Sequence, residues 1–214
     1  MSTVTPKTTP RKYVSKKVSE RVIERKDRFL DAGLEVFGTV GLRGAKVKLL
    51  CNEAGLTERY FYESFQNVED LFSAVYHKNN TTIYELFVNK LPTFPEDIGE
   101  RTHAALSLYF KIMKNDRLVR VLLLESLTGS EEIRKSHHES IRQLAKLAAQ
   151  FIRIDNPDIT LREEVLETVA LAINGAVSTL ATQWMMEGYA TRKKDMIEGA
   201  VLTVMGIMAE LRMR

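Results

Sequence analysis

Apolar residues recur every three to four positions along most of the chain, which is the spacing of amphipathic helices. No stretch of the sequence alternates apolar and polar residues in the way a half-buried strand would. The first helical pattern begins at Ser19 and ends at Gly41, with apolar positions at Val22, Ile23, Phe29, Leu30, Ala32, Gly33, Leu34, Val36 and Phe37. The pattern predicts an all-α protein.

Two short helices follow, separated by a tight turn. The first carries an apolar stripe before Gly55, and the second begins at Thr57 and holds Phe61 and Phe65. Asn67 is a predicted N-cap of a long helix that Pro92 and Pro95 end. Further helices are expected near residues 96–114, 116–127, 130–153, 160–187 and 191–213, with Thr160 and Glu163 forming a capping box for the fourth of them.

These elements divide into three predicted parts. Residues 1–18 are rich in Thr, Ser, Pro and Lys and lack apolar periodicity, so we expect a flexible basic arm. Residues 19–66 are expected to form a three-helix domain with a helix-turn-helix. Residues 67–214 are expected to form a helical domain for ligand binding and dimerisation.

Positive charge is concentrated at one end of the chain. Residues 1–28 carry nine basic and three acidic side chains, whereas the whole chain has a net charge of only +3. A basic end of this kind suits a polyanion such as nucleic acid, although a solubilising arm has the same composition.

Residues 47–65 have the features that a DNA-binding helix-turn-helix requires. The two helices of such a motif must cross closely, which favours small residues such as Cys51 and Ala54. A sharp turn must join them, and Gly55 can provide it. Thr57 is expected to cap the second helix, and Phe61 and Phe65 to anchor it.

The outward face of that second helix is the predicted DNA-reading surface. Arg59 is the best candidate for a bidentate contact to a guanine edge, with Tyr60 on base edges or a thymine methyl and Tyr62 on a phosphate. Lys46 and Lys48 are placed to meet phosphates near a helix N-terminus. Glu58 and Glu63 oppose DNA binding unless one of them orients Arg59 or accepts from a cytosine.

The segment from residue 28 to residue 71 resembles the DNA-binding domain of the TetR/AcrR family of bacterial transcriptional regulators. The resemblance rests on Phe37 to Gly41 closing the first helix, on Ala54-Gly55-Leu56-Thr57, on Phe61-Tyr62, and on Phe65 before an acidic helix start. It implies an Ω-shaped homodimer whose ligand domain binds a small molecule and thereby changes the spacing of the two recognition helices. Most members are repressors.

The sequence departs from the family pattern at several contact positions. Ala45 and Lys46 stand where the family commonly has a capping Thr or Ser, and Val68 where it commonly has a phosphate-contacting Lys. Arg59 and Tyr60 replace a frequent Gly-Thr pair. We expect basic residues of the arm and the following helix to make up for these losses, with contacts from Lys12, Lys16, Lys17 and Arg21.

The last two predicted helices are candidates for a dimer interface. Apolar residues follow one face of residues 160–187, with Gly175 and Ala176 permitting close helix approach. Ile197, Val201, Val204, Met208 and Leu211 form a coiled-coil-like seam in the next helix. Two such helices per subunit suit a four-helix bundle, although the same residues also suit an internal core.

A small, largely apolar effector is expected between the C-terminal helices. The residues expected to bind it are Tyr84, His103, Tyr109, Phe110, Asn174 and Trp184. Aromatic residues at helical spacing are, however, often core residues. His137 and His138 are neighbours on a helix and point about 100° apart, which favours a surface position over a metal site. No cofactor is expected.

Other functional classes lack the motifs they need. There is no nucleophile elbow, phosphate loop or dinucleotide fingerprint, so we do not expect an enzyme. One cysteine, no unbroken apolar stretch of membrane-spanning length and no secretory signal favour a cytoplasmic protein without a membrane partner. The remaining alternative is a non-specific polyanion or membrane-surface binder acting through the arm.

Overall fold

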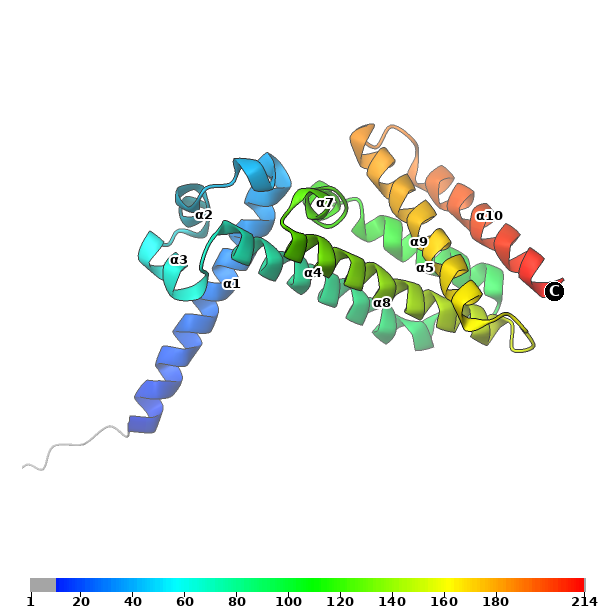
Figure 1. The fold of residues 1–214 in the computed structure, drawn as a ribbon, viewed down its shortest axis with the longest axis horizontal. Helices are drawn as coiled ribbons and strands as arrows, with labels where there is room; N and C mark the ends of the chain where they lie inside the picture. The colour runs from blue at the N-terminus through cyan, green and yellow to red at the C-terminus, as the bar shows by residue number, and fades with distance from the viewer. Residues whose placement is uncertain (1–10, 214) are drawn as a thin grey trace, which may run out of the picture.

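The structure is a computed structural model that describes residues 11–213 as helices joined by short loops, with side chains described from Glu20 onward. No strand occurs in these residues, which confirms the all-α prediction. Figure 1 shows the elements in order: α1 (Arg11–Gly44), α2 (Val47–Ala54), α3 (Glu58–Ser64), α4 (Val68–Lys90), the short 3-10 helix η1 (Leu91–Thr93), α5 (Ile98–Ile112), α6 (Asp116–Val119), the π-helical segment η2 (Arg120–Glu125), α7 (Ser126–Thr128), α8 (Glu131–Asp155), α9 (Glu163–Met186) and α10 (Lys193–Arg212).

Aromatic rings form the core of the N-terminal region. The Phe29 ring lies edge-on to Phe61 and Phe65, with centroids 5.5 Å and 6.1 Å apart, and all three are buried. Such T-shaped pairs stabilise a core beyond their buried area. They fix α3 against α1, as the sequence predicts from the spacing of Phe61 and Phe65.

The beginning of α1 differs from the prediction. The helix starts at Arg11, so residues 11–18 are helical where the sequence favours an arm; residues 1–10 lie outside the described residues. Val22 and Ile23 are exposed, at 45% and 61%, because this part of α1 extends past α2 and α3 (Figure 1). The absence of apolar periodicity indicates that a segment is not buried, but it does not exclude a helix. Lys and Arg have high helix propensity, so a segment rich in them can be helical while exposed.

The other end of α1 is broken at Gly41. This residue has φ 77° and ψ 170°, a conformation that glycine adopts far more readily than other residues, and only one further helical turn follows. The predicted end of the first helix at Gly41 is therefore confirmed.

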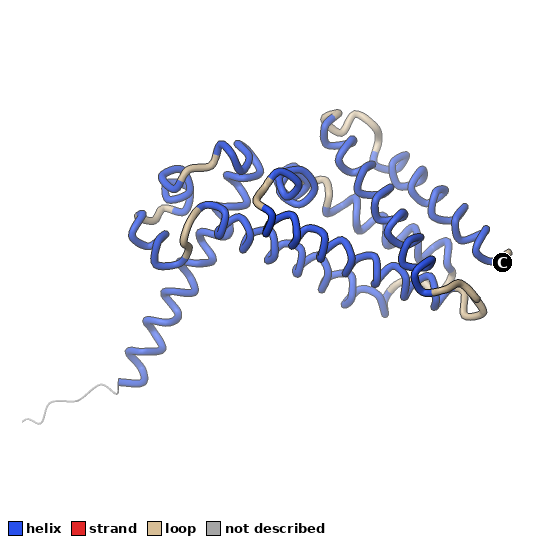
Figure 2. The backbone as a smooth tube through the Cα atoms, in the orientation of Figure 1, coloured by secondary structure: helices blue, strands red, loops and turns tan. Residues whose placement is uncertain are grey.

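The C-terminal region is a layered bundle of long helices. Figure 2 shows α4 leaving the helix-turn-helix and running beside α8, with α9 and α10 at the end of the molecule away from the helix-turn-helix. The predicted helices near 96–114, 130–153, 160–187 and 191–213 are present as α5, α8, α9 and α10. The capping box is not, because α9 begins at Glu163 with Arg162 as N-cap and without a side-chain cap.

The predicted helix over 116–127 is interrupted. The structure has α6, the π-helical segment η2 and α7 in this stretch, so the chain keeps a helical path with one wide turn inside it. π-Helical turns are rare and are frequent at functional sites.

The predicted dimer seam lies inside the subunit. Ile197 is buried in one core cluster and Met208 and Leu211 in a second, and the partly buried Val201 and Val204 pack against these clusters. The exposed face of α10 instead carries Gly199, Leu202 and Gly206. The periodicity was sufficient to predict an apolar face but not which neighbour covers it.

Among the described residues, α9 is the one helix long and apolar enough to cross a membrane by length and composition. A core helix of a globular protein meets the same criterion, so this is weak evidence for a membrane span. Leu166, Ala170, Val177, Ala181 and Trp184 on α9 are buried within the chain.

Candidate DNA-binding surface and ligand cavity

The turn between α2 and α3 has the geometry of a helix-turn-helix. Gly55 ends α2 in the left-handed region, at φ 61° and ψ 37°, and the Leu56 N–H donates to the Cys51 carbonyl at 2.9 Å. The Arg28 guanidinium donates to the carbonyls of Ala54 and Gly55 at 2.6 Å and 3.2 Å. Because these carbonyls end α2, Arg28 ties the turn to α1.

The α3 surface presents a connected network of charged side chains. Arg59 is 84% exposed, and its Nε donates to Glu63 at 3.0 Å. Arg25 of α1 approaches the other oxygen of Glu63 at 3.8 Å and lies over the Tyr60 ring at 4.2 Å. Glu63 thus orients Arg59. This is one of the two arrangements in which we expect an acidic residue on this face to be compatible with DNA binding.

The other predicted DNA contacts lie around the same surface. Tyr62 is 59% exposed on α3, and Lys48 is exposed in the first turn of α2. Lys46 is the N-cap residue of α2 but makes no side-chain cap, and Thr57 is the N-cap of α3 without a side-chain hydrogen bond. The Thr57 hydroxyl is therefore free of the capping role predicted for it. The extension of α1 adds exposed Arg21 and Lys26.

A large cavity lies in the C-terminal region between α4, α5, α8 and α9. Its volume is about 680 Å³, within the range of small-molecule sites, and its lining is mostly aliphatic and aromatic. It extends along α8 from His137 to Asp155, a length of roughly 27 Å at the rise of an α-helix. The cavity is therefore long and narrow.

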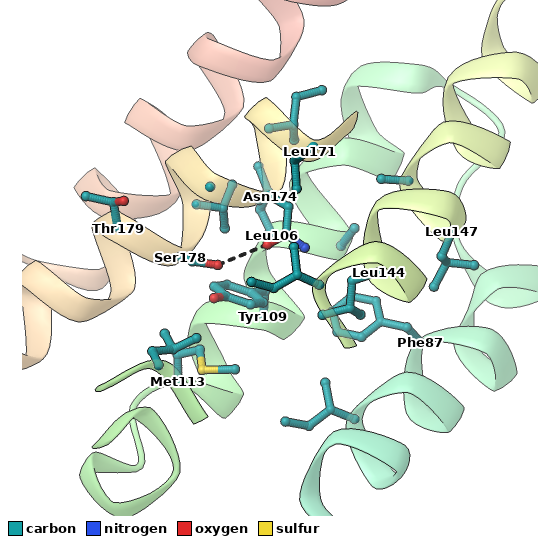
Figure 3. A pocket seen from close by; sticks show the side chains of 18 of the residues that line it. Phe87, Leu106, Tyr109, Met113, Leu144, Leu147, Leu171, Asn174, Ser178 and Thr179 are labelled. Carbon is teal, nitrogen blue, oxygen red and sulfur yellow. Dashed lines mark hydrogen bonds between the residues drawn. The ribbon is translucent and has the colours of Figure 1, made fainter. Parts of the chain in front are cut away.

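One wall of the cavity carries a group of polar side chains. Tyr109 of α5 and Asn174 and Ser178 of α9 lie together there, and Ser178 donates to the Asn174 side-chain oxygen at 3.2 Å (Figure 3). The Tyr109 hydroxyl is buried and makes no hydrogen bond of normal geometry with the described residues. Burial raises the pKa of Tyr109 to about 12, with Ser178 opposing part of the rise, so the phenol is neutral.

Of the six predicted ligand residues, Tyr109 and Asn174 line this cavity and four do not. Phe110 and Trp184 are core residues whose rings meet edge-on at 5.9 Å, and the Trp184 indole donates to the Thr191 carbonyl at 2.7 Å. Tyr84 is half-buried on α4, and His103 is exposed on α5. The spacing of residues along a helix does not show which face of the helix borders the cavity and which face packs in the core or meets solvent.

His137 is buried, contrary to the predicted surface position. Its Nδ1 lies 3.0 Å from the Ser126 hydroxyl and 3.2 Å from that of Tyr76, beside the cavity. Burial, followed by the charge of His138, lowers its pKa. Neighbouring His138 is exposed, and no cluster of three metal-binding side chains occurs in the described part of the chain.

An ion pair between Arg101 and Asp155 lies in the cavity lining, at the C-terminal end of α8. Both side chains are largely buried, and Arg101 also donates to the carbonyls of Pro95 and Glu96. Arg101 and Asp155 are the charged residues of the cavity lining. Because they neutralise each other, the rest of the cavity carries no unpaired charge.

Segment η2 connects the cavity with the N-terminal region. Leu122, Leu123 and Leu124 line the cavity. In the same segment, Glu125 accepts from the Leu42 N–H at 2.8 Å and from Arg120 Nε at 3.1 Å, and Arg120 donates to the Thr39 carbonyl at 2.8 Å. We call these three contacts the Arg120–Glu125 clamp. Neither residue of the clamp stood out in the sequence, because a single charged pair five positions apart has no distinctive pattern.

Comparison with known proteins agrees with this architecture. Residues 29–75 match the family model described as bacterial regulatory proteins, tetR family. An uncharacterised HTH-type transcriptional regulator, YdgC of Bacillus subtilis, is 25% identical over 175 residues, covering 78% of this chain and 84% of the relative.

Solved structures share the fold at lower identity. The fatty acid degradation regulator FadR of Bacillus halodurans is 18% identical, with a TM-score of 0.75 over 85% of this chain and 95% of that one. FadR of Bacillus subtilis, solved in complex with stearoyl-CoA, is also 18% identical, with a TM-score of 0.70 over 81% of this chain and 94% of that one. Together with the helix-turn-helix geometry, these findings assign residues 29–75 to a DNA-binding domain of the tetR family kind and support a transcriptional regulator whose fold the solved structures share.

Proposed function

We propose that the protein is a ligand-responsive repressor that binds a pseudo-palindromic operator as a homodimer. The observation that carries the proposal is the position of η2, which forms part of the cavity wall and also holds α1 through the Arg120–Glu125 clamp. A ligand that displaces Leu122 to Leu124 acts on a segment bonded directly to the helix-turn-helix region. We propose residues 19–66 as the DNA-binding part and 67–214 as the part that binds ligand and dimerises.

The DNA-reading residues proposed are those on the exposed surfaces of α2 and α3. Arg59 is held by Glu63 and exposed, which leaves its remaining guanidinium donors for a guanine edge. Lys46, Lys48, Thr57, Tyr60 and Tyr62 surround it. Basic residues on the α1 extension would contact phosphates without reading sequence.

The outer faces of α9 and α10 support the homodimer. On α10, Leu202 is 67% exposed, and Gly199 and Gly206 have open space where a side chain would lie. Only 22% of the most apolar stretch of α9 is buried within one chain. Glycines beside an exposed leucine allow helices of a second copy to pack closely, as in a four-helix bundle.

The effector proposed is a small molecule with a long apolar part. A narrow cavity of about 680 Å³ with mostly apolar walls suits an extended chain. The Bacillus subtilis regulator that shares this fold was solved with stearoyl-CoA, whose acyl chain has this shape. We propose that the protein acts in the cytoplasm, by binding and not by turnover.

The proposal is tested by measuring affinity for a site enriched from genomic DNA, with and without stearoyl-CoA. We expect the ligand to weaken DNA binding about five- to 150-fold, the usual range of allosteric coupling. Ala148→Phe, which fills the cavity, should abolish the response, whereas Gln150→Phe on the exposed face of α8 should keep it. An equal response in both variants would show that the ligand does not act through the cavity.

A further inference from the structure

The polar group on the cavity wall narrows the chemistry of the effector, an inference that rests on the proposed function. Tyr109, Asn174 and Ser178 stand among Leu106, Leu144 and other apolar side chains (Figure 3). A buried polar group that lacks a hydrogen bond costs about 1–3 kcal/mol, so a wall that keeps such groups needs an explanation.

Some hydrogen-bond donors of Tyr109, Asn174 and Ser178 have no acceptor within the part of the chain that the structure describes. Ser178 uses its hydrogen on the Asn174 side-chain oxygen at 3.2 Å, so the Asn174 amide offers its nitrogen to the cavity. Among the described residues, no hydrogen bond uses that nitrogen, and the Tyr109 hydroxyl has only the Ser178 hydroxyl nearby, with which it makes no hydrogen bond of normal geometry. Two donors from opposite helices, α5 and α9, therefore remain at one place on the wall.

The surroundings of these donors exclude a charged partner. Arg101, the cation of the cavity lining, lies two helical turns from Tyr109 along α5, roughly 12 Å away at the helical rise, and is paired with Asp155. A carboxylate placed beside Tyr109 and Asn174 would lose its hydration without gaining a counter-charge, which is strongly unfavourable. An uncharged acceptor meets no such penalty.

We propose that Asn174 and Tyr109 bind a carbonyl oxygen of the effector, in a ketone, ester or thioester with an apolar chain. Asn174 is the primary donor and Tyr109 the second, and Ser178 holds the Asn174 amide in the orientation that presents its nitrogen. The rest of the cavity selects length and apolar character, and this pair selects an uncharged carbonyl over a free carboxylate.

The test compares 2-undecanone with undecanoate by calorimetric titration of the full-length protein. The wild type is expected to bind the ketone at least about tenfold more tightly than the carboxylate. Asn174→Leu and Tyr109→Phe should each weaken ketone binding about three- to tenfold, the effect of one neutral hydrogen bond. Thr182→Val is the matched control, because Thr182 borders the cavity but its hydroxyl already donates to the Ser178 carbonyl at 2.9 Å.

Fluorescence of bound Nile red shows whether each variant keeps an apolar cavity. Ketone binding that is unchanged in Asn174→Leu and Tyr109→Phe, or a preference for undecanoate, would overturn the inference and leave the proposed function standing. If neither compound nor the dye binds the wild type, both the inference and the ligand-responsive function are wrong.

Discussion

The Arg120–Glu125 clamp gives the most informative perturbation in the molecule. Glu125 accepts from the Leu42 N–H at 2.8 Å and from Arg120 at 3.1 Å, with its side chain only 15% exposed. A hydrogen bond to a charged group contributes about 1.5–3 kcal/mol, and a partly exposed ion pair about 0.2–1 kcal/mol. Glu125→Ala is therefore expected to lower the free energy of unfolding by about 2–4 kcal/mol.

Glu125→Gln separates the two contributions. The amide oxygen still accepts from the Leu42 N–H, but the charge that pairs with Arg120 is gone, so the expected loss is about 1 kcal/mol. Urea denaturation followed by circular dichroism measures both variants. Glu85→Ala, at an exposed position of α4, is the control and should change stability by less than about 0.5 kcal/mol.

The same variants test the coupling between cavity and DNA. With the clamp weakened, movement of η2 no longer shifts α1 fully, so stearoyl-CoA should change operator affinity less in Glu125→Gln than in the wild type. A Glu125→Ala protein as stable as the control, with an undiminished ligand response, would refute the reasoning.

Four further predictions follow from single residues. Gly55→Ala should lower the unfolding free energy by about 1–2 kcal/mol in urea, because φ 61° is strained for alanine, and an unchanged midpoint would contradict this. Arg59→Ala should cost about 1–3 kcal/mol on the enriched site but little on random DNA in fluorescence anisotropy, whereas equal losses would exclude base reading. Leu202→Lys should convert a dimer to a folded monomer in sedimentation velocity, and a persistent dimer would place the interface elsewhere. The raised pKa of Tyr109, about 12, means that the folded state holds this proton more tightly than the unfolded state does. Stability should therefore fall between pH 10 and 12, and less steeply in Tyr109→Phe; equal slopes would contradict the assignment.

Local signals in the sequence were sufficient to predict the helix-turn-helix. Gly55 requires a left-handed turn, and Phe61 and Phe65 require burial on one face of a short helix, so each residue constrains its own neighbourhood. The Asn67 cap was found for the same reason, and its side chain accepts from the Asp70 N–H.

Features that depend on distant partners could not be predicted in this way. Phe110, Trp184, Tyr109 and Asn174 all have suitable spacing, but only tertiary packing decides that the first two fill the core and the last two border the cavity. Burial of His137 likewise depends on Tyr76 and Ser126, which come from other helices.

Sequence-specific DNA binding is the central claim, and enrichment from a genomic library tests it most directly. The purified protein is incubated with fragmented genomic DNA at physiological salt, and the bound fragments are sequenced. Recovery of one pseudo-palindromic motif is the predicted result, because two copies of α3 read two related half-sites. Uniform recovery of fragments would contradict it and would leave the basic α1 extension as a general polyanion anchor.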